Sequence, residues 1–246
     1  MKIYVGFDKK NVLAYEVCVA SLIRHATIPL DIIPVKDWIL RRDKLFWRSS
    51  IIDEKGQNVD RNDRSAFSTD FSFTRFCVPA MAEYKDEWVL FIDSDIMFRT
   101  DIAESVDHLD SQHAVYCVQH EHKPYEESKM FGLKQTYYRR KNWSSFMFMN
   151  PARCTGLTPY AVNNWSGESL HAMLWVDDGL IGALPKKWNY LLNCMEPVYN
   201  PAVVHFTLGT PDMLPTTHAC TYTNEWWRYA KDIELYSQGT YYHVPE

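Results

Sequence analysis

The sequence lacks several features that mark specialised classes of protein. It has no apolar run long enough to cross a membrane, and it has no Cys-X-X-Cys pair of the kind found in zinc sites. Its net charge is −5, so there is no excess of basic residues for nucleic acid. We therefore expect no transmembrane segment, no zinc site built from cysteines and no nucleic-acid partner.

What is present fits one globular domain. The chain has 246 residues, of which 46% are hydrophobic and 23% charged, enough for a single α/β domain with a sizeable core. We expect that domain to span 1–246 and to include a helix at 223–237. The six cysteines are scattered through mostly apolar surroundings, and the opening MKIYVGFD enters a strand pattern without a secretory signal. We therefore expect reduced thiols and a cytoplasmic protein.

Strand-like and helix-like patterns alternate along the chain, and Pro34 indicates that its strand lies at an edge or end. The predicted strands are 2–7, 30–35, 88–92, 114–118, 145–149 and 202–206, and the predicted helices are 11–25, 72–84, 101–109 and 223–237. Polar residues 53–66 predict a mobile loop, and 177–184 predict the start of a helix. Such alternation predicts a mostly parallel central sheet flanked by helices, with ligands at the carboxyl ends of its strands.

The segment WVLFIDSDIMF places two acids, Asp93 and Asp95, at the edge of the most apolar strand. One interpretation is a strand end followed by a polar turn, which aspartate favours. The other is a metal site, because hard divalent cations bind clustered oxygen atoms. Asp8 follows the first strand, so it is expected at the same edge of the sheet, which favours the metal site.

The segment TRFCVPAMAEYKDEWVLFIDSDIMFRTDIAE resembles the donor-site core of GT-A glycosyltransferases. The resemblance is closest to glycosyltransferase family 8, the glycogenin-like and lipopolysaccharide galactosyltransferase-like enzymes. IYVGFD, WVDDGLIGALPKKWNYL and AVVHFTLG resemble further segments of that family in the same order, from about residue 2 to 211. The resemblance implies a Rossmann-like GT-A fold with a DxD motif at a strand end, and transfer of a sugar from a nucleotide sugar to an acceptor with retention.

Chemistry supports a metal role for the DxD motif. A nucleoside diphosphate leaves readily only when its growing negative charge is neutralised, and a divalent ion bridging both phosphates does this. The resemblance assigns Asp93, Asp95 and His205 to Mn²⁺ or Mg²⁺, and an imidazole ligand suits Mn²⁺ better. The alternative for His205 is a core histidine with its hydrogen bonds satisfied.

Other matching residues are expected to contact the donor, which the resemblance makes a UDP-sugar. Asp8 is expected at the uracil or ribose, and Tyr15 on the face of the base. Arg75 suits a phosphate or sugar hydroxyls, because its guanidinium presents a rigid fork of donors. Ser94 and Gly209 belong to the same donor-binding segments. The alternatives are a strand-end turn for Asp8, helix packing for Tyr15 and a surface position for Arg75.

Two further acids, Asp177 and Asp178, occupy the place of the acidic segment that lies beside the donor sugar in the family. We expect them to be catalytic, with Asp177 touching the sugar hydroxyls and the reacting centre. A helix N-terminus also favours acids, and this is the alternative for Asp178. How retention is achieved stays open between a double displacement using Asp177 and a front-face path.

The sequence departs from the family at two places. Thr210 stands where the family carries a lysine for the diphosphate, so Lys186 or Lys187 is the expected substitute, or the metal alone binds the phosphates. Trp143 and Ser145 replace an asparagine and a glycine, so contacts with the acceptor or sugar are expected to differ.

Three functions are compatible with these residues. The first is the metal-dependent glycosyltransferase. The second is a haloacid-dehalogenase-type phosphatase, whose fold also places an aspartate nucleophile after a strand. The third is a nucleotide-sugar-binding protein without activity on the same scaffold. Under the first, the polar segment 119–142 is expected to border the active site and to help admit the acceptor or cover the donor.

Overall fold

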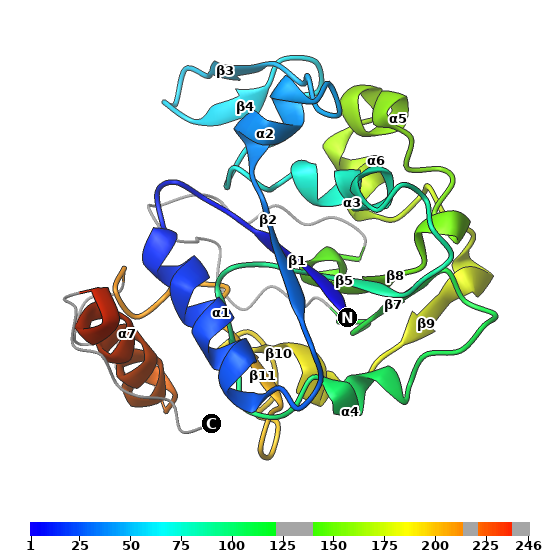
Figure 1. Ribbon diagram of the computed structural model, residues 1–246. Coiled ribbons are helices and arrows are strands. Elements are labelled where there is room, and N and C mark those ends of the chain that lie inside the picture. The colour runs from blue at the N-terminus through cyan, green and yellow to red at the C-terminus, as the bar shows by residue number, and fades with distance from the viewer. Residues whose placement is uncertain (122–139, 214–220, 238–246) are drawn as a thin grey trace.

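The computed structural model describes residues 1–121, 140–213 and 221–237. A central six-stranded sheet has the order β2-β1-β5-β8-β7-β9, and all its strands except β8 run in one direction (Figure 1). The strands are β1 (Lys2–Gly6), β2 (Asp31–Val35), β5 (Val89–Ile92), β7 (Val115–Cys117), β8 (Phe146–Met149) and β9 (Ile181–Ala183). This confirms the predicted α/β fold with a mostly parallel sheet, and β2 with its Pro34 lies at the edge.

Two smaller sheets accompany the central one. The first contains β10 (Tyr190–Leu191), β11 (Val203–His205) and β6 (Ile96–Phe98). β6 begins directly after the acidic pair and runs antiparallel to β11, with Ile96 opposite His205. This pairing brings a residue from late in the chain beside the DxD turn. The second is the hairpin of β3 (Ser50–Ile52) and β4 (Asn58–Asp60).

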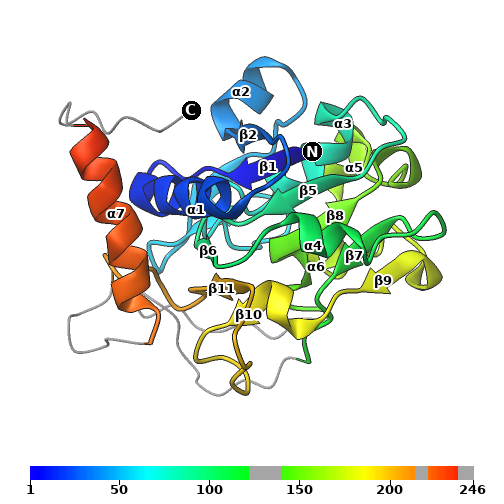
Figure 2. The same ribbon diagram turned by 60° about the horizontal axis from the view of Figure 1, so that its bottom comes forward.

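Seven α-helices belong to the described part of the chain: α1 (Val12–His25), α2 (Asp37–Arg42), α3 (Val78–Met81), α4 (Ala103–Val106), α5 (Pro159–Asn164), α6 (Gly167–His171) and α7 (Thr223–Ser237). Helix α7 lies beside α1 in both views (Figures 1 and 2), and Nε2 of His25 is 3.0 Å from the Tyr229 hydroxyl. Among the described helices, none has both the length and the apolar character that a membrane span requires.

Alternating side chains of the central sheet divide the core into two layers. Tyr4 and Phe91 point into a cluster covered by residues 71–82, α5 and α6. Val5 and Leu90 point into the opposite cluster, which is covered by α1. This alternation follows from the two-residue period of a strand. A third cluster buries Trp226 of α7 against β6 and β11.

Several predicted elements differ from the structure. Residues 53–66 are not simply a loop, because β4 and its partner β3 form a hairpin there. The predicted helix 72–84 is shorter and divided into a 3₁₀ helix (Thr74–Cys77) and α3, with Pro79 in the first turn of α3, where proline is tolerated. Residues 177–184 form a 3₁₀ turn (Asp178–Leu180) followed by β9. Within the predicted segment 119–142, residues 122–139 lie outside the described residues.

The cysteines agree with the expectation of reduced thiols where the structure describes them. Cys18, Cys77, Cys117 and Cys154 are buried, Cys194 is half-buried, and all five are free thiols. Burial raises the pKa of the Cys117 thiol to about 12, so this thiol stays protonated and inert at neutral pH. Cys220 lies outside the described residues.

Candidate active site

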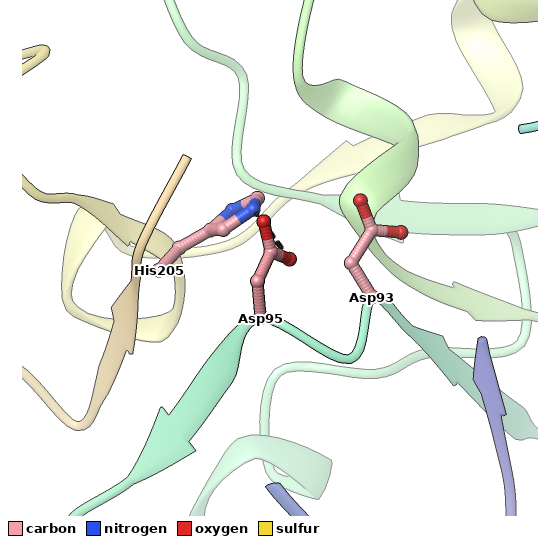
Figure 3. A group of neighbouring side chains, drawn as sticks. All are labelled: Asp93, Asp95 and His205. Carbon is pink, nitrogen blue, oxygen red and sulfur yellow. Dashed lines mark ion pairs between the residues drawn. The ribbon is translucent and has the colours of Figure 1, made fainter. Parts of the chain in front are cut away.

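The acidic pair forms a tight turn between β5 and β6 (Figure 3). The amide of Asp93 donates to the Ser145 carbonyl at 2.9 Å, which ties the turn to the segment before β8. The Asp95 carbonyl accepts from the amide of Phe206 at 2.9 Å, which ties the other end to the segment after β11. Backbone hydrogen bonds to the segments beside β8 and β11 therefore hold both ends of the turn that carries the two carboxylates.

His205 completes the cluster from β11. Single ligand atoms of Asp93, Asp95 and His205 all lie within 4.8 Å of one another, and Nε2 of His205 is 3.1 Å from Oδ1 of Asp95. His205 is only 3% exposed, and Asp93 9%. The Oδ1 atoms of Asp93 and Asp95 are buried and form ion pairs but no hydrogen bond of good geometry. Two carboxylates and one imidazole so placed fit a divalent cation.

The two carboxyl groups differ in their electrostatic surroundings. Burial raises the pKa of Asp93 to about 6, although the Arg75 guanidinium partly opposes the shift. Burial acts in the same direction on Asp95, but the attraction of His205, together with a backbone amide and Arg75, more than offsets it and leaves the pKa of Asp95 below its usual value. Two buried acids side by side carry a cost in repulsion and desolvation that nearby positive charge relieves.

Arg75 supplies such a charge. It is buried at 6% exposure, so the predicted alternative of a surface arginine is wrong. Its Nη1 lies 2.8 Å from Oδ1 of Asp93 and donates to the Ser144 carbonyl at 2.9 Å. Its Nε donates to the Phe71 carbonyl at 3.2 Å. The guanidinium is thus held in place against the DxD turn.

Asp8 lies at the same edge of the sheet, as predicted. β1 and β5 are parallel neighbours with Val5 beside Ile92, so Asp8 and Asp93 both follow carboxyl ends. Asp8 is buried, and its Oδ1 accepts from the amide of Lys10 at 2.8 Å. Burial raises its pKa, although that amide partly opposes the shift. A carboxylate has more acceptor sites than this bond uses, so Asp8 can still accept from a ligand.

Phe7, the residue before Asp8, contacts two further aromatic rings. The Tyr15 ring meets the Phe7 ring edge-on at a centroid distance of 5.2 Å. Trp38 of α2 also meets the Phe7 ring edge-on, at 5.6 Å, and it is 37% exposed. Nζ of Lys9 lies 4.4 Å from the Trp38 ring centre, and Nζ of Lys36 lies 4.9 Å from that of Phe7. The sequence pointed to Tyr15 but not to Trp38, because helix α2 was not predicted.

Ser94 and Gly209 both belong to turns at this site. Ser94 is buried between the two aspartates. Gly209 has a φ of 130°, a region that favours glycine, and its amide donates to the Phe206 carbonyl at 2.9 Å. It therefore shapes the chain directly after the His205 strand.

Thr210, at the place of the family's lysine, is fully buried. Its Oγ1 accepts from Nδ2 of Asn11 at 3.0 Å, and Asn11 caps the N-terminus of α1. Its role is therefore structural. Lys187, one of the expected substitutes, lies 3.5 Å from Glu104, and its carbonyl accepts from the amide before β11. Because His205 ends β11, Lys187 lies toward the other end of that strand. Among the residues that the structure describes, the cation in contact with the DxD turn is Arg75.

The structure places Asp177 and Asp178 directly before β9, and both are exposed. Ile181 of β9 pairs with Val115, the first residue of β7, so β9 starts at the end of the sheet opposite to Asp93. Oδ1 of Asp178 lies 2.6 Å from Nη2 of Arg140. No full helix follows these acids, so helix capping does not explain them. Their catalytic role stays a prediction.

One residue that the sequence did not mark as functional contacts the cluster. Asn189 lies 2.9 Å from Nδ1 of His205, and it also contacts Ser145. Asn189 belongs to PKKWNYL, which was noted only for its resemblance. Nothing in its local sequence distinguishes it from other asparagines.

Sequence comparison relates the chain to one curated protein. No protein-family model matches it. It is 38% identical over 218 residues to Protein CDI of Arabidopsis thaliana, covering 85% of this chain and 78% of that protein. The chain belongs to the family of Protein CDI.

Solved structures show the fold of this CDI-family member. The galactosyltransferase LgtC, solved with donor and acceptor sugar analogs, matches with a TM-score of 0.57 and 12% identity, over 100% of this chain and 98% of that one. The bifunctional glycosyltransferase WbbM matches with a TM-score of 0.58 and 13% identity, over 98% of this chain and 52% of that one. GlyE of Streptococcus pneumoniae TIGR4 matches with a TM-score of 0.53 and 13% identity, over 100% of this chain and 66% of that one. The chain thus spans about two thirds of GlyE and about half of WbbM. The fold is that of GT-A glycosyltransferases, and membership of family 8 stays a prediction.

Proposed function

We propose that the protein is a metal-dependent glycosyltransferase that takes a sugar from a nucleotide sugar and resembles family 8. The observation that carries this proposal is the cluster of Asp93, Asp95 and His205 at the carboxyl edge of a GT-A sheet. That edge is where such sheets bind ligands. Fold alone does not assign activity, so these three residues carry the proposal.

Asp93, Asp95 and His205 would hold Mn²⁺ or Mg²⁺. Bound there, the ion would neutralise the charge that grows on the diphosphate leaving group. Arg75 lies against Asp93 and provides a fixed positive charge for the same phosphates. Because it is buried and anchored to backbone carbonyls, its position needs little rearrangement when the donor binds.

The donor proposed is a UDP-sugar. Asp8 would accept hydrogen bonds from the uracil or ribose, and Tyr15 with Phe7 and Trp38 would contact the flat base. Lys9 and Lys36 lie over these rings, so they add positive charge near a ligand that is itself anionic. Ser94 and Gly209 would shape the turns around the diphosphate.

Asp177 and Asp178 are proposed as the carboxylates on the sugar side, in a reaction that retains the anomeric configuration. This part of the proposal depends on the family resemblance alone. An Asp177→Asn variant tests it, because loss of turnover with unchanged Mn²⁺ affinity would separate a sugar-side role from metal binding. Unchanged turnover would remove Asp177 from the mechanism.

The test of the proposed function is release of nucleoside diphosphate from a panel of nucleotide sugars with Mn²⁺. Asp95→Asn and His205→Gln should each lose most of this activity while remaining folded, and EDTA should silence the wild type until Mn²⁺ is restored. Asp110→Asn is a matched control, because Asp110 pairs with His113 at 2.8 Å outside the cluster. It should keep wild-type activity.

Three outcomes would overturn the proposal. Full activity in a chelated, metal-free sample would remove the metal. Hydrolysis of p-nitrophenyl phosphate with Mg²⁺, without nucleotide-sugar turnover, would favour a phosphatase. Binding of nucleotide sugars without turnover, after a broad screen of acceptors, would favour a protein that only binds them.

A further inference from the structure

A buried chain of hydrogen bonds leads from the backbone to the imidazole of His205. Nδ1 of His205 lies 2.9 Å from Oδ1 of Asn189. Nδ2 of Asn189 donates to Oγ of Ser145 at 2.9 Å. The hydroxyl of Ser145 donates in turn to the carbonyl of Asn142 at 2.7 Å. Asn189 is 0% exposed and Ser145 2%, so water does not compete for these bonds.

The chain has only one consistent direction. The Asn142 carbonyl can only accept, so the single hydroxyl proton of Ser145 is used there. Ser145 must then accept from Asn189, which turns the amide nitrogen of Asn189 toward Ser145. The amide oxygen therefore faces His205. An amide oxygen cannot donate, so Nδ1 of His205 must carry a proton.

We propose that Asn189 is a positioning residue that fixes the tautomer of His205, and that Ser145 sets the orientation of the Asn189 amide. With Nδ1 protonated, Nε2 is the nitrogen left to bind a metal, and it is the one that points at Asp95. Partners of this kind orient a ligating histidine and raise its basicity. The consequence for metal affinity rests on the proposed function, whereas the tautomer itself does not.

Ser145 serves the cluster in a second way. Its carbonyl accepts from the amide of Asp93 at 2.9 Å, while its hydroxyl orients Asn189. One residue thus contacts both the turn after β5 that carries Asp93 and the residue that orients the imidazole on β11. This links two strands that are far apart in the sequence, and it gives a physical reason for the serine at the place where the family carries a glycine.

The test compares four variants by two measurements. Asn189→Leu removes the acceptor at Nδ1. Asn189→Asp replaces the amide with a carboxylate, which presents an acceptor oxygen to Nδ1 in either orientation of the group. Ser145→Ala removes the hydroxyl that orients the Asn189 amide. The double variant Ser145→Ala/Asn189→Asp combines this change with the carboxylate at position 189. The first measurement is ¹⁵N NMR of the neutral His205 ring in metal-free protein, assigned with His205→Gln. The second is Mn²⁺ affinity by electron paramagnetic resonance.

The wild type and Asn189→Asp should show the Nδ1-protonated tautomer. Asn189→Leu should lose this preference and bind Mn²⁺ about 10- to 100-fold more weakly. Ser145→Ala should show a mixture of tautomers, and the double variant should recover the single tautomer, because a carboxylate accepts in either orientation. Asn150→Leu, a change at another buried asparagine, should leave the tautomer unchanged even where it lowers stability.

An Nε2-protonated tautomer in the wild type would overturn the inference. So would an Asn189→Leu variant that is folded and keeps both the tautomer and the Mn²⁺ affinity of the wild type. A double variant no better than Ser145→Ala would remove the orienting role of Ser145. If the wild type does not bind Mn²⁺ at all, the proposed metal site fails, while the tautomer measurement still decides the role of Asn189.

Discussion

Arg75 and Asp93 form a buried ion pair beside the candidate metal site, with Nη1 2.8 Å from Oδ1 and side chains only 7% and 12% exposed. The pair sits next to a second acid, Asp95, whose Oδ1 lies 3.1 Å from Nε2 of His205. Because a guanidinium does not lose its proton in a protein, Arg75 is a permanent positive charge beside the two carboxylates. Removing one partner of such a pair leaves the other buried and uncompensated.

Arg75→Met should therefore lower the free energy of unfolding by about 3–5 kcal/mol in EDTA, the range for a broken buried pair. Saturating Mn²⁺ should stabilise the variant, because a ligand that binds only the folded state adds to its stability. Urea unfolding with EDTA and with Mn²⁺ measures both effects. Lys2→Met, which breaks the exposed pair with Glu87, should cost far less. Equal losses in the two variants would contradict the buried role of Arg75.

The exposed ring of Trp38 leads to a second prediction. Trp38→Ala should weaken UDP binding by about 1–3 kcal/mol, the scale of stacking between a base and an aromatic ring, with Mn²⁺ affinity unchanged. Trp47→Ala is the control, because Trp47 is also exposed but lies before the hairpin β3–β4. Calorimetry with UDP, GDP and CDP in the presence of Mn²⁺ measures the effect. Equal affinities for the three nucleotides in the wild type would remove the uridine assignment.

The sequence predicted the parts of the fold that local pattern controls. The apolar run 88–92 forms β5, and the amphipathic segment 223–237 forms α7. A strand buried on both faces has a continuous apolar run, and a helix buried along one stripe has apolar residues at a helical spacing, so both patterns can be recognised in the sequence. The DxD turn and His205 were also predicted together, and the structure brings them within 4.8 Å. That grouping needed the family resemblance, since no local pattern links residues 93 and 205.

Tertiary contacts decided what the sequence did not predict. Residues 53–66 are polar and turn-rich, yet Asp60 is fully buried because Arg48 pairs with it at 2.8 Å. β9 is only three residues long, and its strand conformation comes from pairing with β7. The roles of Asn189 and Ser145 depend on a contact across 44 residues. Propensity carries no information about partners at such distances.

The Arg48–Asp60 pair leads to a third prediction. Both side chains are at most 1% exposed, and Arg48 also donates to the carbonyls of Val162 and Trp165. Asp60→Asn should lower the free energy of unfolding by about 3–5 kcal/mol, because it leaves the buried guanidinium with only Asp63, 3.8 Å away, as a counter-charge. Arg48→Met/Asp60→Asn should lose less than the sum of the two single changes. Urea unfolding of all four proteins checks this, and strictly additive losses would show that the pair is not coupled.

The contact between α1 and α7 predicts a dependence of stability on pH. Nε2 of His25 lies 3.0 Å from the Tyr229 hydroxyl, and burial lowers the pKa of His25 below its ordinary value of 6.5, although Glu225 partly opposes the shift. The unfolded chain therefore binds a proton more readily than the folded protein. The free energy of unfolding should fall as the pH drops below 6.5, and it should level off once the folded protein also binds the proton.

His25→Gln should remove this part of the pH dependence. Glutamine does not titrate, so the stability of the variant should change less than that of the wild type between about pH 7.5 and about pH 5.5. Tyr229→Phe is the matched control, because it removes the hydroxyl and keeps the half-buried histidine. Urea unfolding at both pH values, followed by tryptophan fluorescence, to which the buried Trp226 of α7 contributes, measures the effect. Parallel pH profiles for the wild type and His25→Gln would show that His25 does not couple α7 to pH.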